Sequence, residues 1–580
     1  MTREAYRRLS WVIAMAMTLA IFLAVFLKLD YRYAQNDDAG ILRSFMGYET
    51  GKPAHFHIYI HGLLAWPLHA LALAFPGVAW FSVLQIALLC FADVLIAKSI
   101  MQCFVKHDQP FWLGALFAAM FLTAFALSAC AHITFTLTSA LLGAAAVVQM
   151  FSVDYERASD GAVVRGLLLA LAPALLAYAL RQITALPVLA FCGLGFAMIA
   201  AERFGFGKAK RRSLKPMLVS LLAVVLAMGG MAGVRAWEIA SNDAGDYLAW
   251  QDATAEILDY QGTQDLSPEA LADVGWSENT RLLVNDWFFL DPDISTEAFE
   301  TLAAVQRGQE SEKPGARMSG ALGLLGRFAR TETNAMRSAM LLLLVVALCV
   351  FGAVTRKGRT ARLLTALGVT LTLLAAMLLY LALEGRLPTR AVMTALLPAA
   401  GLIFALLPAC LPKPDGRRRL RPVLAVLTAL CVAQTVYYAA GAVPGLLRNE
   451  AAAEIGEPVA DLDEYALSEP DMLFIHDSTL AIDTRLFPDT SEGIPHNVTY
   501  WGGWSLGSRE SIEQFANFGI DLASFPPETF LREDVCLASG VIDPPPEKLL
   551  NYLREKVDPS VDYTIYSEYG NVHFFQFYLP

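Results

Sequence analysis

Long apolar runs dominate the pattern of the chain. A helix needs about 20 apolar residues to cross the hydrocarbon core of a membrane. Runs at or near that length lie at 9–28, 78–105, 111–129, 132–152, 166–181, 183–202, 216–239, 339–354, 363–383, 391–411 and 422–441. The pattern predicts a polytopic α-helical membrane protein with about 11 transmembrane helices, and 13 is the alternative if further runs split.

Residues 58–75 are also apolar, but we interpret them as an interfacial or re-entrant helix. They contain His61, Pro67 and His69, which a lipid-exposed span tolerates poorly. Counting them as a span would also place the basic loops on both sides of the membrane, against the general excess of Lys and Arg on the cytoplasmic side.

The basic loops predict which polar segments are exported. Clusters of Lys and Arg lie in 203–215, 356–362 and 413–421, and the N-terminus is basic as well. Such loops stay cytoplasmic. We therefore expect a multi-pass plasma-membrane protein with a cytoplasmic N-terminus. The first run is long and lacks a small-residue cleavage site, which favours an uncleaved anchor.

The same count divides the chain into a membrane domain, 1–441, and an extracytoplasmic domain, 442–580. The membrane domain carries two extracytoplasmic segments, 30–77 and 241–338. The C-terminal pattern is typical of a small α/β domain. Its expected elements are a linker at 443–470, a strand at Met472–His476, a helix at Ser508–Phe518 capped by Ser508, and a hairpin of Val561–Ser567 and Asn571–Leu579. In the second extracytoplasmic segment we expect helices near Tyr247–Tyr260 and Thr296–Arg307.

Composition sharpens this assignment. The 580 residues are 56% apolar and only 17% charged, against about 25% in soluble proteins. The net charge of −11 divides into −10 on 241–338, −17 on 442–580 and +16 on the remainder. This acidity argues against a nucleic-acid binder. The sequence also lacks a P-loop, a dinucleotide-binding glycine motif, HExxH and G-x-S-x-G in a credible context.

Asn36-Asp37-Asp38, just after the first run, is the strongest chemical signal. Two carboxylates at a membrane surface can hold a divalent cation or act as a general base. The alternative is an ordinary N-cap for a helix over Ala39–Met46. His55, His57 and His61 follow, and with Asp37 and Asp38 they are the candidate ligands of a divalent metal such as Mg or Mn. Interfacial histidines also serve simply as hydrogen-bonding residues.

Arginines form a second signal at the predicted outer surface. Arg181 lies at the junction of the fifth and sixth runs, and Arg386 and Arg390 lie in the short turn GRLPTR. Arginine suits the binding of a lipid phosphate because its planar guanidinium offers several donors. The alternative is that Glu384 pairs with Arg386 while Arg390 snorkels.

The turn Trp501-Gly502-Gly503-Trp504 precedes the capped helix of the C-terminal domain. Its tryptophans suit stacking on the sugar of an acceptor. They equally suit packing, or seating the domain on the bilayer, where Trp is enriched.

The layout resembles the GT-C superfamily of membrane glycosyltransferases. The stretches NDDAGILRSFMGYETGKP and GRLPTR further resemble a group of bacterial integral membrane proteins placed near that superfamily. The resemblance implies transfer of a sugar from a polyprenyl-phosphate carrier to an extracytoplasmic cell-envelope acceptor, usually with inversion. It further implies that Asp37 or Asp38 is the general base while the other orients it or helps bind a cation. Arg386 or Arg390, with Arg181, would then stabilise the departing phosphate.

Two other function classes compete with an enzyme. A transporter or lipid flippase tends to show inverted repeats and helices broken at the midplane, and the sequence shows neither. A noncatalytic assembly protein of envelope glycan synthesis would need no acidic pair. The glycosyltransferase hypothesis implies a lipid-linked sugar donor, a glycan or lipid acceptor and membrane lipids as partners, and no nucleic acid.

Overall fold

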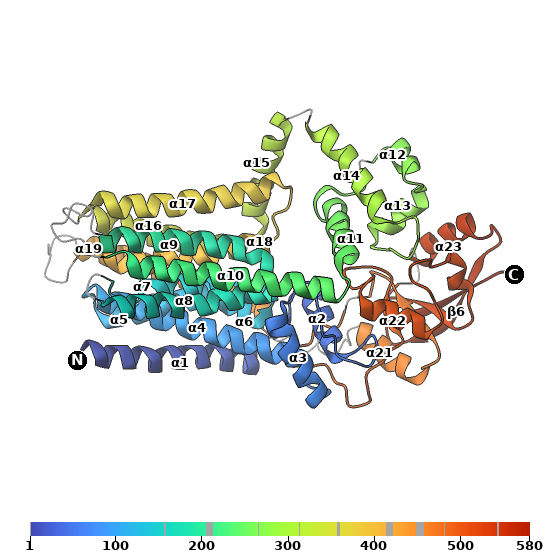
Figure 1. Cartoon of the computed structure of the whole chain (residues 1–580), viewed down its shortest axis with the longest axis horizontal. Helices are drawn as coiled ribbons and strands as arrows, with labels where there is room; N and C mark the ends of the chain where they lie inside the picture. Colours follow the sequence, from blue (N-terminus) through green and yellow to red (C-terminus); the bar gives the residue numbers. More distant parts are fainter. Residues whose placement is uncertain are drawn as a thin grey trace.

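The structure, a computed structural model, describes residues 2–155, 158–204, 213–264, 266–311, 314–355, 360–412, 421–447, 458–480, 482–541 and 545–580. Long apolar helices lie side by side in a bundle, and a polar head of 242–303 and 458–580 covers one end of it (Figure 1). The N-terminus lies at the opposite end. The basic segments 205–212, 356–359 and 413–420 lie outside the described residues, so the assignment of membrane sides stays a prediction.

Ten helices of the described chain are long and apolar enough to cross a membrane, which confirms a multi-pass membrane protein. They are α1 (Arg3–Lys28), α4 (Trp80–Lys106), the continuous stretch α5–η1–α6 (Phe111–Phe121, Leu122–Ala126, Leu127–Ala131), α8 (Asp160–Leu180), α9 (Ala185–Phe204, preceded by the 3-10 turn η2, Gln182–Thr184), α10 (Lys215–Ser241), α16 (Thr333–Val354), α17 (Thr360–Leu383), α18 (Thr389–Cys410) and α19 (Arg421–Leu446).

The fourth predicted run forms α7 (Phe135–Phe151), which has 17 residues and is buried along almost its whole length. It packs against α4, α8, α9 and α18 in the middle of the bundle. Small residues permit this packing: a Cβ on Gly143 would lie 2.2 Å from Cγ2 of Val188. With α7 included, every predicted run is helical, although α7 is shorter than a full span.

The polar segment after α1 contains α2 (Asn36–Met46) and α3 (Gly62–Ala74). With 13 residues α3 is too short to cross a membrane, as expected for 58–75. It leaves Leu63, Leu73 and the following Phe75 exposed at the junction of bundle and head. An exposed apolar surface on a short helix is typical of a segment lying in the membrane interface.

The C-terminal part of the head is an α/β domain with a five-stranded sheet in the order β4-β3-β5-β7-β6. The strands are β3 (Leu473–His476), β4 (Val498–Tyr500), β5 (Val535–Ser539), β6 (Asp562–Tyr569) and β7 (Val572–Tyr578), and the helices are α21 (Pro458–Ser468), α22 (Arg509–Asn517) and α23 (Pro545–Lys556). The first three strands are parallel, and β6 and β7 form the predicted antiparallel hairpin.

The predicted strand at 472–476 and the helix capped by Ser508 are confirmed. The expected linker at 443–470 is partly wrong. The helix α19 runs on to Leu446, and α21 occupies 458–468 because its apolar residues Val459, Leu462 and Ala466 pack on the sheet. Residues 448–457 of this linker lie outside the described residues.

The insertion contributes α11 (Gly245–Ala255), η3 (Glu256–Gln261), α12 (Pro268–Asp273), α13 (Glu278–Asn285), α14 (Thr296–Ser311) and α15 (Pro314–Thr331). Its buried side chains join one apolar core with the sheet. Phe288, for example, lies 5.5 Å from both Trp501 and Tyr552 between ring centroids. The two acidic segments therefore form a single head.

Candidate functional site

A two-stranded parallel ladder lies next to the acidic pair, at the end of the bundle that the head covers. It joins β1 (Arg32–Tyr33) to β2 (His132–Ile133), and the amide of Ala34 donates to the carbonyl of Ile133 at 3.0 Å. Since α2 begins directly after β1 and α7 directly after β2, the ladder places the N-termini of the two helices side by side.

Asp38 is completely buried at this point. Its Oδ1 accepts hydrogen bonds from the amide of Phe135 at 2.6 Å and from Nε2 of Gln85 at 2.9 Å, whereas its Oδ2 has no partner. Burial raises the pKa of Asp38 to about 8. The N-cap of α2 is Gln35, so the acidic pair does not cap its own helix, and the alternative interpretation of the motif is wrong.

Asp37 is the accessible member of the pair, with 31% of its side chain exposed. Its Oδ2 lies 3.3 Å from Nη1 of Arg390, in the first turn of α18. The same Nη1 donates to Oε1 of Gln35 at 2.8 Å. An arginine from the GRLPTR turn thus reaches the acidic motif, 353 residues away in the sequence.

Arg181 directs unused donors into the same place. It ends α8 in an extended conformation, and its guanidinium lies 4.7 Å from the ring centroid of Tyr59 and 4.3 Å from that of Phe135. Its Nε and Nη1 are buried without a partner. Burial lowers the pKa of Arg181, and burial together with the charge of Asp37 raises that of Tyr59. Buried donors without partners are rare in proteins and call for an explanation.

The other charged residues of the outer turn, Glu384 and Arg386, do not form the pair that the sequence offered as an alternative. Glu384 lies 3.3 Å from Arg317 of α15, and Arg386 forms an ion pair with Asp259 of η3. Arg386 is therefore next to the site but engaged with the insertion, while Arg390 and Arg181 face the acidic motif.

The three histidines make separate hydrogen bonds and do not converge on the acidic pair. His55 Nε2 lies 2.7 Å from Oδ1 of Asn242, and His57 Nδ1 accepts from the amide of Tyr59 at 3.1 Å. His61 Nδ1 accepts from the amide of Leu63, and its Nε2 donates to the carbonyl of Met231 at 2.9 Å.

Within the described part of the chain no three His, Cys, Asp or Glu side chains are grouped closely enough to hold a metal ion. The five predicted ligands are therefore not assembled as a metal-binding set, and we assign no chemical step to a metal.

The two tryptophans have different environments. The Trp504 ring lies 4.7 Å from His57 and 5.6 Å from Tyr59 between centroids, and a Cβ on Gly40 of α2 would be 3.0 Å from it. Trp501 is only 1% exposed, and its Nε1 donates to the carbonyl of Asp286 at 3.1 Å. Trp501 thus belongs to the core of the head, and Trp504 covers the helix that carries the acidic pair.

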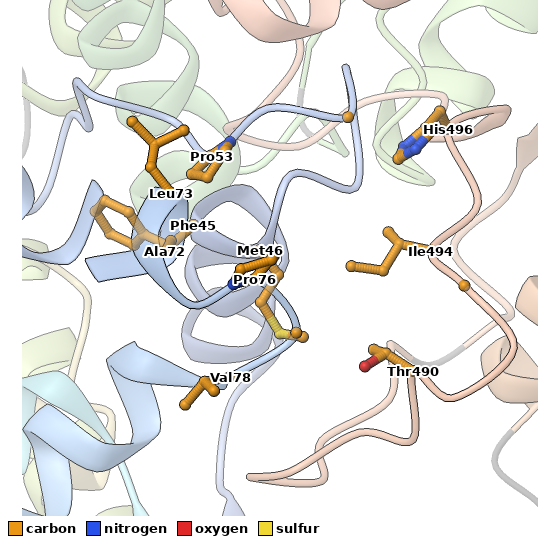
Figure 2. A pocket seen from close by; sticks show the side chains of 13 residues that line it. Phe45, Met46, Pro53, Ala72, Leu73, Pro76, Val78, Thr490, Ile494 and His496 are labelled. Carbon is orange, nitrogen blue, oxygen red and sulfur yellow. The ribbon is translucent and has the colours of Figure 1, made fainter. Parts of the chain in front are cut away.

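A cavity of about 450 Å³ opens between the α2–α3 region and a loop of the head. Figure 2 shows Met46 and Val78 on one side and Thr490, Ile494 and His496 across from them. None of its lining residues is Asp, Glu, Lys or Arg. The cavity therefore lies apart from the charged residues of the site.

Sequence reasoning missed Gln85, in the second turn of α4, whose Nε2 donates to Oδ1 of Asp38. A glutamine within an apolar run is itself a signal, because polar residues in membrane helices are costly and tend to be functional. The amide of Phe135 left no sequence signal, since any residue supplies a backbone N–H. The position of Tyr59 under Arg181 depends on long-range packing that the local pattern does not encode.

No protein-family model and no curated protein matches the sequence. Among solved structures, the chain is similar to ArnT from Cupriavidus metallidurans, in the apo state with a TM-score of 0.38 and bound to undecaprenyl phosphate with a TM-score of 0.36. Each comparison covers 97% of both chains at 14% identity. ArnT is a GT-C glycosyltransferase, the superfamily that the sequence resembles.

Proposed function

We propose that this protein is a membrane glycosyltransferase that moves a sugar from a polyprenyl-phosphate carrier to an extracytoplasmic acceptor with inversion. One observation carries the proposal: Asp37, Arg390 and Arg181 from three distant segments converge beside the buried Asp38. A carboxylate next to cationic donors is what displacement at a sugar phosphate requires, namely a base for the nucleophile and positive charge for the leaving group.

In the reaction, a hydroxyl oxygen of the acceptor attacks the anomeric carbon while the bond from that carbon to the phosphate oxygen breaks. The hydroxyl proton passes to the carboxylate of Asp37, which is the exposed member of the pair. The bonding electrons leave with the phosphate oxygen. Arg181 has two free donors to receive the developing charge, and Arg390 supplies a second cation.

Asp38 acts as a positioning residue in this mechanism. Its Oδ1 ties the first turn of α2 to the first amide of α7 and to Gln85 of α4, so the direction of Asp37 depends on it. Its complete burial keeps it away from an acceptor. The proposal thus gives different roles to the two acids that the sequence left interchangeable.

The test uses the purified full-length protein in lipid nanodiscs, with a panel of polyprenyl-phosphate monosaccharides as donors and an envelope lipid extract as acceptor. Release of polyprenyl phosphate is followed by mass spectrometry. We expect Asp37→Asn to lower the rate at least about 100-fold, as for loss of a general base, without a change in Tm. Glu384→Gln, which removes a surface carboxylate paired with Arg317, is the matched control and should keep the rate. Full activity in Asp37→Asn, or no release by the wild type from any donor, would contradict the proposal.

A further inference from the structure

A second cavity, of about 240 Å³, has Trp504 and His57 in its lining. It is formed by the C-terminal half of α2 and the loop after it, by the corner between α10 and α11, and by the start of α22. The lining side chains that matter for its chemistry are Glu49, His55, His57, Tyr247, Trp504 and Glu510.

Two acidic side chains, Glu49 and Glu510, line this cavity. Burial raises the pKa of Glu49 to about 7, with the charge of Glu510 adding to the effect, and burial likewise raises the pKa of Glu510. Oε2 of Glu49 is buried without a partner. Asp243 and Arg509 are exposed residues of the lining and offset one another in charge. The enclosed part of the cavity therefore offers hydrogen-bond acceptors and disfavours any further negative charge.

His57 adds a second, independent sign of a ligand. It is 4% exposed and lines the cavity, and its Nε2 has no partner because Nδ1 already accepts from the amide of Tyr59. Burial, with nearby Arg235 and Arg181, lowers the pKa of His57 to about 3, so the ring is neutral and Nε2 carries the proton. The lining of the cavity thus contains a buried donor, Nε2 of His57, and a buried acceptor, Oε2 of Glu49, and neither has a partner.

We propose that this cavity binds one sugar ring of the acceptor, and that this ring has no acidic substituent. Carboxylates, an imidazole and Asn242 are planar groups that hydrogen-bond to ring hydroxyls, and Trp504 and Tyr247 supply aromatic faces. The volume is below that of drug-sized pockets, which begin at about 300 Å³, and suits a single ring. A carboxylate or phosphate on the ring would bring a further negative charge beside Glu49 and Glu510, in a place where burial already disfavours ionisation.

The assignment to the acceptor rests on the proposed function. The sugar of the donor is bonded directly to the phosphate and must stay beside Arg181 and Arg390. Asp37, Arg181 and Arg390 are all absent from the lining of the cavity, and Ser44, its one lining residue on α2, lies roughly 10 Å further along that helix than Asp37 at the helical rise per residue. A ring bound away from these three residues belongs to the molecule that receives the sugar.

The experiment measures binding alone, by saturation-transfer NMR on the full-length protein in detergent. The probes are methyl glycosides of glucose, galactose and mannose, each paired with its uronic-acid counterpart. We expect at least one neutral glycoside to bind roughly 10-fold more tightly than its uronide. Glu49→Gln with Glu510→Gln should reduce this discrimination to roughly 3-fold or less, because both repelling charges are gone while the hydrogen-bonding shape is kept.

Glu492→Gln, the same change beside the other cavity, is the matched control and should leave both affinities unchanged. Equal binding of neutral and acidic probes, no binding of any neutral glycoside, or unaltered discrimination in the double variant would overturn the inference. The Asp37→Asn variant should bind the neutral glycoside with the affinity of the wild type, because Asp37 does not line the cavity. Failure of the proposed function would appear instead as absent release of polyprenyl phosphate, in an assay that does not depend on these probes.

Discussion

Arg43 and Asp463 are joined by two parallel hydrogen bonds of 2.6 and 2.9 Å, although 420 residues separate them. Arg43 lies on α2, the helix of the acidic pair, and Asp463 lies on α21 of the head. Both side chains are largely buried, at 14% and 15% exposure. The head therefore holds the helix whose first turn carries Asp37.

Exchanging the two charges tests this link. Asp463→Asn alone leaves Arg43 buried without its anion, and we expect it to destabilise the protein by somewhat less than the ~3–5 kcal/mol typical of fully buried pairs. The double variant Arg43→Asp with Asp463→Arg should recover a clear part of both Tm and the transfer rate. No recovery in the double variant would show that the pair does not act as a unit.

The pKa of Asp38 predicts a pH dependence of stability. Its folded pKa of about 8 lies above the unfolded value near 4, so between these values the folded state holds a proton that the unfolded state has lost. The contribution of Asp38 to the free energy of unfolding is complete at about pH 4. It is lost as the pH rises towards 8, by up to ~1.4 kcal/mol per pH unit. Asp38→Asn cannot ionise and should lack this slope when Tm is measured from pH 5 to 8. Parallel curves for the wild type and the variant would contradict the burial argument.

Asp38→Asn also separates positioning from catalysis. The asparagine oxygen still accepts from Phe135 and Gln85, so we expect transfer to fall less than about 10-fold. Asp38→Ala removes the acceptor of two buried donors and should cost about 1–3 kcal/mol for each unpaired group, measured by denaturation. Loss of activity in Asp38→Asn as severe as in Asp37→Asn would assign the base to Asp38.

Arg181 should govern the affinity for the carrier. We expect Arg181→Gln to weaken binding of polyprenyl phosphate at least about 10-fold in a thermal-shift titration, because two buried donors are available for the phosphate. Arg181→Lys should recover little, since an ammonium lacks the planar donor pair. Arg317→Gln is the control, as this arginine pairs with Glu384 at the surface. Unchanged binding in Arg181→Gln would remove this residue from the site.

The two tryptophans should respond differently to truncation. Trp501→Ala empties a buried position in the head and should cost about 3–5 kcal/mol. Trp504→Ala removes only a ring, because its backbone carbonyl is the group that accepts from Tyr247 and Gln251. We therefore expect a smaller loss of Tm and a rise in KM for the acceptor. Equal losses of Tm would show that both rings are purely structural.

Much of this fold is encoded locally and can be read from the sequence. The apolar runs predict the membrane helices because every span must form its backbone hydrogen bonds within itself, and its side chains face lipid or other helices. The hairpin at 561–579 and the helix after Ser508 follow from strand alternation and a capping residue. The helix α21 was missed because its segment is rich in acidic residues, and only packing on the sheet reveals its apolar face.

The site was predictable in its charged members and not in their arrangement. Asp37, Asp38, Arg181 and Arg390 are conspicuous because charge at a membrane boundary is costly. Which acid is buried depends on the β1–β2 ladder and on a backbone amide of α7, and neither leaves a trace in side-chain identity. The histidines were equally conspicuous, yet the chain uses them to fasten loops.

The joint core of the head sets the order in which this protein becomes functional during biosynthesis. Asp37 is made within the first tenth of the chain, but Trp504 and Asp463, which cover and hold its helix, emerge from the ribosome near the end. The insertion likewise waits for the sheet to bury its aromatic side chains. A chain that stopped before the sheet would thus insert its helices without the residues that cover and hold α2.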